Sequence, residues 1–104
     1  MKDSPVGSFE EQVMLAVLRT APESYGMQVR RELEAVTGRD VSIGSVYITL
    51  DRLEAKGLVT SGRESGSRRV FTVTPLGARA LAETRSIRER LWDGVDLGML
   101  LENA

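Results

Sequence analysis

Apolar residues recur every three or four positions in four segments of the chain, a spacing that predicts four amphipathic helices. The predicted helices cover residues 8–20, 25–36, 42–56 and 75–92. The first is apolar at most of its positions, which predicts a deeply buried helix. After the fourth, Gly94 and Gly98 are expected to weaken the helix before the chain ends.

Residues that cap helices support these boundaries. Side chains suited to an N-cap stand at or just before the start of each segment: Ser8, Ser24, Ser42 and Thr74. Glu11 completes a capping box with the serine three positions earlier, and Pro75 occupies a first helical position, where its missing N–H costs nothing. Gly38 and Gly57 stand where the second and third helices should end, because glycine readily adopts the left-handed C-cap conformation.

Between the third and fourth segments the pattern changes to that of a β-hairpin. Strands are predicted over residues 58–64 and 68–74 around a Ser-Gly-Ser turn at 65–67, and the second strand is rich in β-branched and aromatic residues. A helix followed by a basic hairpin is the layout of a winged helix-turn-helix, in which the helix enters the DNA major groove and the hairpin grips the flanking backbone. The expected fold is mainly α with a small β-hairpin.

Composition narrows the chemistry that the chain can perform. Its 104 residues include no cysteine and no histidine, which excludes disulfides and thiolate catalysis and removes the commonest general base and metal ligand. We therefore expect no enzymatic activity, no cofactor and no metal. The N-terminus lacks the apolar core of a signal peptide, and no apolar run approaches the ~20 residues of a membrane span. We expect a cytoplasmic protein without membrane contact, which the lack of cysteine also fits.

Net charge does not favour nucleic acid, because the chain carries a formal charge of −1. The hairpin is nevertheless locally basic, with Arg63, Arg68 and Arg69 beside one acidic residue, Glu64. Arginines on a hairpin can serve only to keep an edge strand solvated. Their position directly after a recognition-helix pattern favours contact with DNA phosphates or the minor groove.

The third helix has one apolar and one polar side. Val46, Leu50 and Leu53 project in the same direction and are expected to face the core. The opposite side carries side chains that can bond phosphates or base edges, with Tyr47 and Thr49 on its flanks. The predicted DNA-contacting residues of the helix and hairpin are Ser42, Ser45, Tyr47, Ile48, Thr49, Arg52, Lys56, Arg63, Arg68 and Arg69.

Two members of this set have a second interpretation. Ile48 is either an ordinary exposed isoleucine or an apolar contact for a thymine methyl group or the sugar backbone. Tyr47 is either a half-buried ring that closes the contact with the second helix or a hydroxyl that bonds phosphate. The sequence leaves both pairs of alternatives open.

The last helix carries an apolar stripe that so small a domain cannot fully cover. The stripe either packs on the first helix of the same chain or pairs with its copy in a second chain, and the second alternative is favoured. A two-fold dimer would place two recognition helices roughly 34 Å apart, as a pseudo-palindromic operator requires. Residues 1–74 are thus the expected DNA-binding domain and residues 75–104 the dimerisation helix and tail. The predicted dimerisation residues are Leu81, Thr84, Ile87, Leu91, Trp92 and Val95.

The order of these motifs resembles the PadR family of transcriptional regulators. The run GSVYITLDRLEAKGLVTS matches the family's small–aliphatic–Tyr helix start and Leu-x-x-Leu-x-x-x-Gly-Leu continuation, and RRVFTVTPLGARAL matches its basic wing and Thr-Pro-x-Gly helix start. The resemblance covers roughly residues 13–91. It departs in the second helix, where the aromatic residue is Tyr25 and Met27 takes the position of the family's usual tyrosine.

The resemblance implies a homodimeric winged-helix repressor with a single C-terminal helix, in which Tyr47 contacts DNA and Arg68–Arg69 are the wing contacts. Some relatives bind flat aromatic molecules at a tryptophan of that helix, and Trp92 is the only tryptophan of this chain. Trp92 is thus either an interface anchor or a platform for a small aromatic effector. A repressor that needs no effector fits the sequence equally well. The alternative function is a winged-helix module that binds an acidic protein partner.

Overall fold

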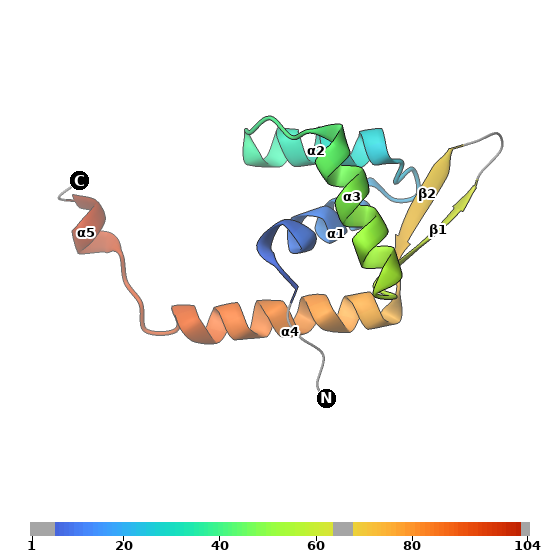
Figure 1. Ribbon diagram of the computed structural model, residues 1–104. Coiled ribbons are helices and arrows are strands. Elements are labelled where there is room, and N and C mark those ends of the chain that lie inside the picture. Colours follow the sequence, from blue (N-terminus) through green and yellow to red (C-terminus); the bar gives the residue numbers. More distant parts are fainter. Residues whose placement is uncertain (1–5, 64–67, 103–104) are drawn as a thin grey trace.

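The computed structural model describes residues 6–63 and 68–102, and the predicted helices and hairpin are present in them. In chain order the elements are α1 (Ser8–Thr20), α2 (Gly26–Thr37), α3 (Ile43–Ala55), β1 (Val59–Arg63), β2 (Arg69–Val73), α4 (Pro75–Trp92) and α5 (Gly98–Glu102). Figure 1 shows α1, α2 and α3 gathered into one body, with the hairpin beside α3 and α4 running along the base and beyond it. The expected mainly helical fold with a small hairpin is confirmed.

The core is built by apolar side chains from the three helices of the body, from the hairpin and from the first part of α4. Val46, Leu50 and Leu53 of α3 are each 0% exposed, as their common direction predicts. They form one cluster with Met14 of α1 and Phe71 of β2. Burying a side chain of this size contributes about 1.5–3 kcal/mol, so the cluster determines which side of α3 remains outside.

Two of the predicted N-caps are confirmed, as are both predicted glycine stops, since Gly57 after α3 also has a left-handed φ, of 77°. Ser42 Oγ accepts a hydrogen bond from Ser45 N at 2.9 Å at the start of α3. Thr74 Oγ1 accepts one from Gly77 N at 3.0 Å at the start of α4. Gly38 follows α2 with a φ of 71°, in the left-handed region that favours glycine. These residues fix the orientation of the two helices that carry the predicted functional positions.

The capping box of α1 is formed one residue earlier than the sequence predicts. Gly7 is the N-cap, and its N–H donates to Glu10 Oε1 at 3.0 Å, so Ser8 is already helical. Glu11, the expected partner of Ser8, instead accepts two hydrogen bonds from Arg88 of α4. A partner distant in sequence therefore overrides the local pattern.

The loop before α2 joins α1 to the hairpin. The prediction that Ser24 caps α2 is wrong. Its buried hydroxyl donates to Val17 O at 2.7 Å, and Tyr25 is the N-cap. Phe71 N donates to Ser24 O at 3.0 Å, and Tyr25 pairs with Val70 in an isolated antiparallel bridge. The hairpin is thus attached by backbone hydrogen bonds to the start of α2.

The hairpin itself has the expected antiparallel register. β1 and β2 pair from Val59 opposite Val73 to Arg63 opposite Arg69. The predicted turn at 65–67 lies outside the described residues. Because Arg63 and Arg69 form the last described pair, both arginines lie where the strands approach that turn.

α4 packs on its own chain along most of its length but not at its last turn. Gly77, Ala80 and Leu81 are buried, and a Cβ at Gly77 would lie 2.1 Å from the backbone oxygen of Leu58. The last turn is different, since Leu91 is 72% exposed. The stripe is therefore covered by its own chain as far as the half-buried Ile87 and is exposed from Leu91 onward. Pairing with a second chain stays a prediction for this exposed end.

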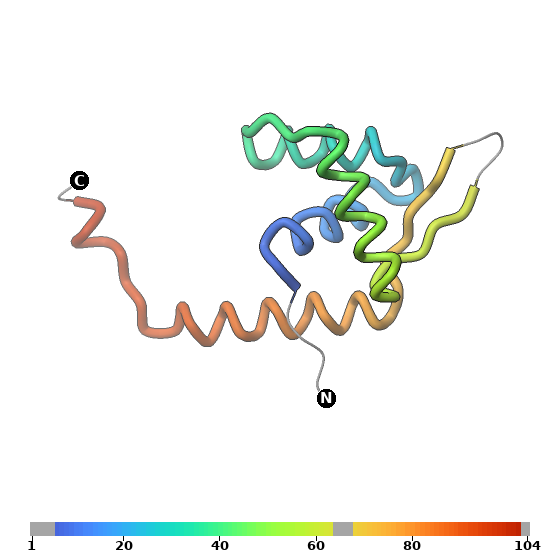
Figure 2. Tube along the Cα trace, viewed as in Figure 1, coloured from blue at the N-terminus to red at the C-terminus, as the bar shows by residue number. Residues whose placement is uncertain are grey.

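Beyond α4 the chain turns and leads into a short helix. Gly94 has a φ of 77°, which confirms the predicted interruption, whereas Gly98 begins α5. Figure 2 shows α4 and α5 extending away from the body. The radius of gyration is 15.8 Å, compared with about 13 Å for a compact domain of 100 residues. Among the described residues, no helix is long and apolar enough to span a membrane.

Candidate nucleic-acid interface

The outer side of α3 presents three of the predicted side chains to solvent. Ser45 and Arg52 are exposed, and Ile48 is 61% exposed. They lie opposite the buried stripe of α3, so their exposure follows from the packing of the helix. Ser42 is also in the predicted set, and it is the N-cap of α3. Its hydroxyl accepts a hydrogen bond from Ser45 N and donates one to Ser45 Oγ at 3.0 Å.

Thr49 does not belong to this exposed side. Its exposure is 5%, which contradicts its predicted place among the DNA-contacting residues. Thr49 follows Val46 by three positions and precedes Leu50 by one, and residues three apart share a helix face. The apolar face of α3 is therefore wider than the three-residue stripe suggests, and Thr49 lies on its edge.

Tyr47 joins the outer side of α3 to the start of α2. An added Cβ at Gly26 would lie 2.4 Å from Tyr47 Cζ and 2.5 Å from its hydroxyl oxygen, so the ring lies directly against that glycine. The tyrosine remains 37% exposed. Both sequence-based interpretations thus have a structural basis, because the ring packs on α2 and part of the side chain still faces solvent.

A groove of about 460 Å³ opens beside this tyrosine, between the start of α2 and the second strand. Arg68 lies over the ring of Tyr25, with Cζ 4.7 Å from the ring centroid. Such a contact contributes about 0.5–1 kcal/mol at an exposed site and holds the guanidinium in place. The residues that line the groove are Tyr25, Met27, Gln28, Arg31, Tyr47, Arg68 and Arg69. Its two aromatic hydroxyls and three guanidinium groups are suited to the phosphates of a nucleic-acid backbone.

Most of the α2 residues in this groove were not in the predicted set. Tyr25 reaches the site because its backbone pairs with Val70, and Arg31 reaches it from the second turn of α2. The signal for them in the sequence is the pair Arg30 and Arg31 on the second helix, although two glutamates, at positions 32 and 34, lie beside this pair. Arg30 does turn away from the groove, since its Nε donates to Val41 O at 2.9 Å.

Lys56, predicted to contact DNA, holds the end of α3 against α1. Its Nζ lies 2.8 Å from Glu10 Oε2, and this hydrogen bond holds the pKa of Glu10 below its ordinary value. The side chain of Glu10 is 13% exposed. Lys56 therefore has a structural partner on the body, its side chain is 50% exposed, and its contact with DNA stays a prediction.

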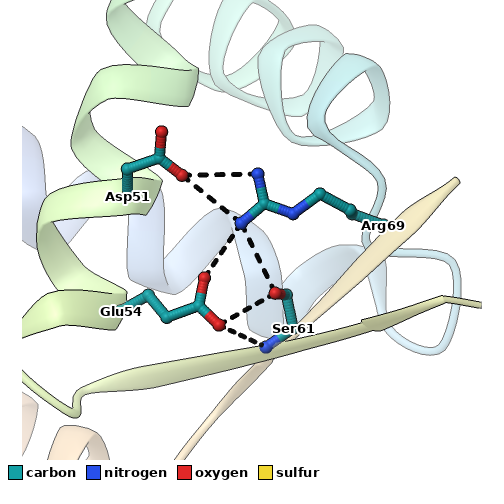
Figure 3. Close-up of polar contacts among 4 residues, drawn as sticks. All are labelled: Asp51, Glu54, Ser61 and Arg69. Atoms are coloured by element: carbon teal, nitrogen blue, oxygen red, sulfur yellow. Dashed lines mark hydrogen bonds and ion pairs between the residues drawn. The ribbon is translucent and has the colours of Figure 1, made fainter.

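Arg69 also has partners within the chain. Its guanidinium bonds Asp51 and Glu54 of α3 and lies over the ring of Phe71, as Figure 3 shows for the polar contacts. The prediction of a phosphate contact at Arg69 overlooked these two carboxylates, which helical spacing places on the hairpin side of α3. Arg63 lies opposite Arg69 in the hairpin and is exposed.

The predicted dimerisation residues divide into two groups. Leu81 belongs to the core of its own chain, which does not support its predicted place in an interface. Thr84 and Ile87 are half-buried, and Thr84 Oγ1 accepts a hydrogen bond from Val6 N at 3.0 Å. The exposed group consists of Leu91, Trp92 and Val95, which are 72%, 54% and 51% exposed.

The fold and the site together define a winged helix-turn-helix protein, in which an exposed recognition-helix face stands beside a basic hairpin. Residues 14–83 match the family model described as the transcriptional regulator PadR-like family. Because this match covers more than half of the chain, the protein belongs to the PadR-like family, and the resemblance noted in the sequence is confirmed. Members of the family are DNA-binding regulators without enzymatic activity.

Individual relatives agree with this assignment. The chain is 39% identical over 84 residues to Transcriptional regulator Rv3488 of Mycobacterium tuberculosis, an alignment that covers 76% of this chain and 78% of that protein. It is 35% identical over 81 residues to an uncharacterized 37.1 kDa protein in transposon TN4556 of Streptomyces fradiae, and it spans 23% of that longer protein. The structure of a PadR family transcriptional regulator from Eggerthella lenta matches with a TM-score of 0.61 and 27% identity, covering 90% of this chain and 87% of the other.

Proposed function

We propose that this chain is a dimeric repressor that binds a pseudo-palindromic DNA operator through α3 and the wing. The observation that supports the proposal most directly is the exposed side of α3 next to a groove lined by Arg31 and Arg68. In this arrangement α3 offers side chains to base edges in the major groove, while the groove cations meet phosphates of the flanking backbone.

Within the helix, Arg52 is the residue best suited to read a base. Its guanidinium is exposed on the outer side of α3, and arginine can bond the O6 and N7 atoms of guanine in a bidentate manner. Ile48, one turn earlier, can contact a thymine methyl group. Ser45 and the hydroxyl of Tyr47 then serve as phosphate or sugar contacts that set the position of the helix.

The dimer is proposed from the uncovered end of α4 and the residues after it. Leu91, Trp92 and Val95 are exposed beside further exposed apolar residues of the tail, Leu97, Met99, Leu100 and Leu101. Apolar surface of this kind at the end of a long helix is typical of a protein–protein interface. A two-fold pairing through α4 would present two copies of α3 to successive turns of one DNA face.

Release by an effector is a further part of the proposal. Trp92 lies in the last turn of α4 and is 54% exposed, so two copies of it across a two-fold axis could hold a flat aromatic molecule between them. Such a ligand would act on operator binding only by favouring one arrangement of the two recognition helices over another.

The full chain should be tested by footprinting and fluorescence anisotropy on the DNA upstream of its own coding region. We expect protection of two half-sites centred about one helical turn apart, and an affinity that falls steeply with salt. Arg52→Ala should weaken binding to the protected site by about 1–3 kcal/mol and binding to random DNA much less. Absence of salt-dependent DNA binding would instead favour a winged-helix module that binds an acidic protein.

A further inference from the structure

Arg69 is enclosed by partners of its own chain. Its Nη2 donates to Glu54 Oε1 at 2.9 Å, and both terminal nitrogens lie 3.3 Å from Asp51 Oδ1. The carbon of the guanidinium lies 4.8 Å from the centroid of the Phe71 ring. Figure 3 shows the guanidinium pointing from β2 toward α3, between the two carboxylates.

Glu54 connects the same network to the other strand. Its Oε2 accepts hydrogen bonds from Ser61 N at 3.1 Å and from Ser61 Oγ at 2.8 Å, while its Oε1 accepts from Arg69. One side chain of α3 is therefore bonded to β1 and β2 together. These bonds connect both strands of the wing to α3.

The two carboxylates are also unfavourable charges for a helix that approaches DNA. Asp51 is adjacent to Arg52 and its side chain is 62% exposed, so its negative charge lies near the proposed DNA-facing side. Negative charges facing a phosphate backbone oppose binding, and the single positive charge of Arg69, bonded to both carboxylates, offsets one of the two. Arg68 differs, because its guanidinium lies over Tyr25 in the open groove instead.

We propose that Arg69 is a positioning residue of the DNA-binding surface, which acts through Asp51 and Glu54 and not through a phosphate. It fixes the wing against α3 and reduces the negative charge there, while Arg68 makes the phosphate contact. This inference rests on the proposed DNA-binding function.

A double-mutant cycle on the full chain tests this role, with an operator fragment as the probe. Arg69→Gln is measured in the native background and in a background that carries Asp51→Asn and Glu54→Gln, which keep the side-chain shapes and remove the charges. We expect a loss of about tenfold in the native background, within the usual range for coupled neighbours. In the neutral background the loss should be less than about twofold, because the partners through which Arg69 acts have lost their charges.

The salt dependence separates positioning from phosphate contact. Arg68→Gln, the matched control, should reduce the slope of log K against log salt by about 0.9 in both backgrounds. Arg69→Gln should reduce the slope only in the native background, where it leaves the charges of Asp51 and Glu54 without their cation, and not in the neutral background. Melting temperatures show whether each variant is folded. Equal losses at Arg69 in both backgrounds, or a slope that Arg69→Gln also reduces in the neutral background, would overturn the assignment. If the native chain binds no DNA, the proposed function itself fails.

Discussion

Tyr47 is the residue at which packing and recognition meet. Its ring lies against Gly26, the first residue of α2, and the residue also lines the groove formed with Arg31 and Arg68. The absence of a side chain at Gly26 is therefore what allows the ring of α3 to lie so close to α2. One small residue on the supporting helix determines where an aromatic residue of the recognition helix is placed.

This contact predicts that Gly26→Ala destabilises the protein and weakens DNA binding. The new methyl group would lie 2.4 to 2.6 Å from three atoms of the Tyr47 side chain, so the ring must move. Overpacking of this kind typically costs about 1–3 kcal/mol, although alanine by itself favours a helix over glycine. Thermal unfolding and operator affinity measure the two effects.

A second background provides the control for this prediction. In a Tyr47→Ala chain the space next to Gly26 is open, and Gly26→Ala should then be neutral or stabilising. If Gly26→Ala is tolerated equally well with and without the tyrosine ring, the ring is not held by α2 as described.

The behaviour of single charged residues could be predicted only in part from the sequence. The exposed positions Ser45, Ile48 and Arg52 follow from helical periodicity, which is a local property. The ion pairs of Lys56 and Arg69 could not be predicted, because their carboxylate partners come from other elements and no local sequence pattern indicates the pairing. The groove residues of α2 were missed for the same reason, since backbone pairing with β2 brings them to the site.

At the scale of elements, the first turn of α1 connects the recognition helix to the C-terminal helix. Glu10 bonds Lys56 at the end of α3, and the adjacent Glu11 bonds Arg88 of α4 at 2.6 and 2.7 Å. The side chains of both carboxylates are largely covered. Neighbouring residues of one helix therefore hold the ends of the two elements that carry the proposed functions.

These ion pairs predict a loss of stability in acid. Hydrogen bonds from Arg88 and Lys56 hold the pKa of Glu11 and Glu10 below the ordinary value of 4.5. A carboxyl whose pKa is lowered by folding stabilises the folded state above its unfolded pKa, and this contribution is lost as the pH falls through the folded pKa. Melting temperature should therefore begin to fall near pH 4.5 and continue to fall below it.

The variant Glu11→Gln tests the assignment of this effect. It keeps the shape of the side chain but cannot titrate, so its melting temperature should be lower at neutral pH and should depend less steeply on pH in acid. Identical pH profiles for the variant and the native chain would show that the acid loss originates at other carboxylates.

The elements themselves were largely predictable, because their signals are local. Apolar spacing, the caps at Ser42 and Thr74, and the stop at Gly38 gave most of the helix positions. The caps at Ser8 and Ser24 were placed wrongly, since the structure uses Gly7 and Tyr25. The hydroxyl of Ser24 bonds α1 instead of capping α2, and Glu11 bonds Arg88 of α4 instead of completing a capping box with Ser8.

For the molecule as a whole, the division of α4 explains how one helix can serve two purposes. Its residues Ala80 and Leu81 belong to the core, Arg88 still bonds Glu11 of α1, and the last turn extends past the body toward α5. From the sequence, packing within the chain and pairing with a second copy are alternatives for the whole apolar stripe, because the apolar periodicity continues along the entire helix. The body is too small to cover the whole length of this helix. Tertiary packing determines where the body stops covering α4, and the apolar spacing of the sequence does not indicate that point.

The uncovered end of α4 leads to the prediction that Leu91→Asp gives a folded monomer. Leu91 is 72% exposed in the single chain, so an aspartate there is compatible with the monomer fold, but in an apolar dimer interface it would be a buried, unpaired charge. Light scattering or sedimentation should report the molecular mass of one chain. Operator affinity should also fall, because each half-site would then be bound independently.

Ile48→Asp is the matched control, since Ile48 is also a strongly exposed apolar residue, at 61%, but lies on α3. This variant should remain dimeric and lose DNA affinity, because the new carboxylate would face the bases and phosphates. The two substitutions thus separate assembly from recognition. A Leu91→Asp chain that remains dimeric with unchanged affinity would place the interface elsewhere and leave the exposed apolar residues of α4 and α5 to another partner.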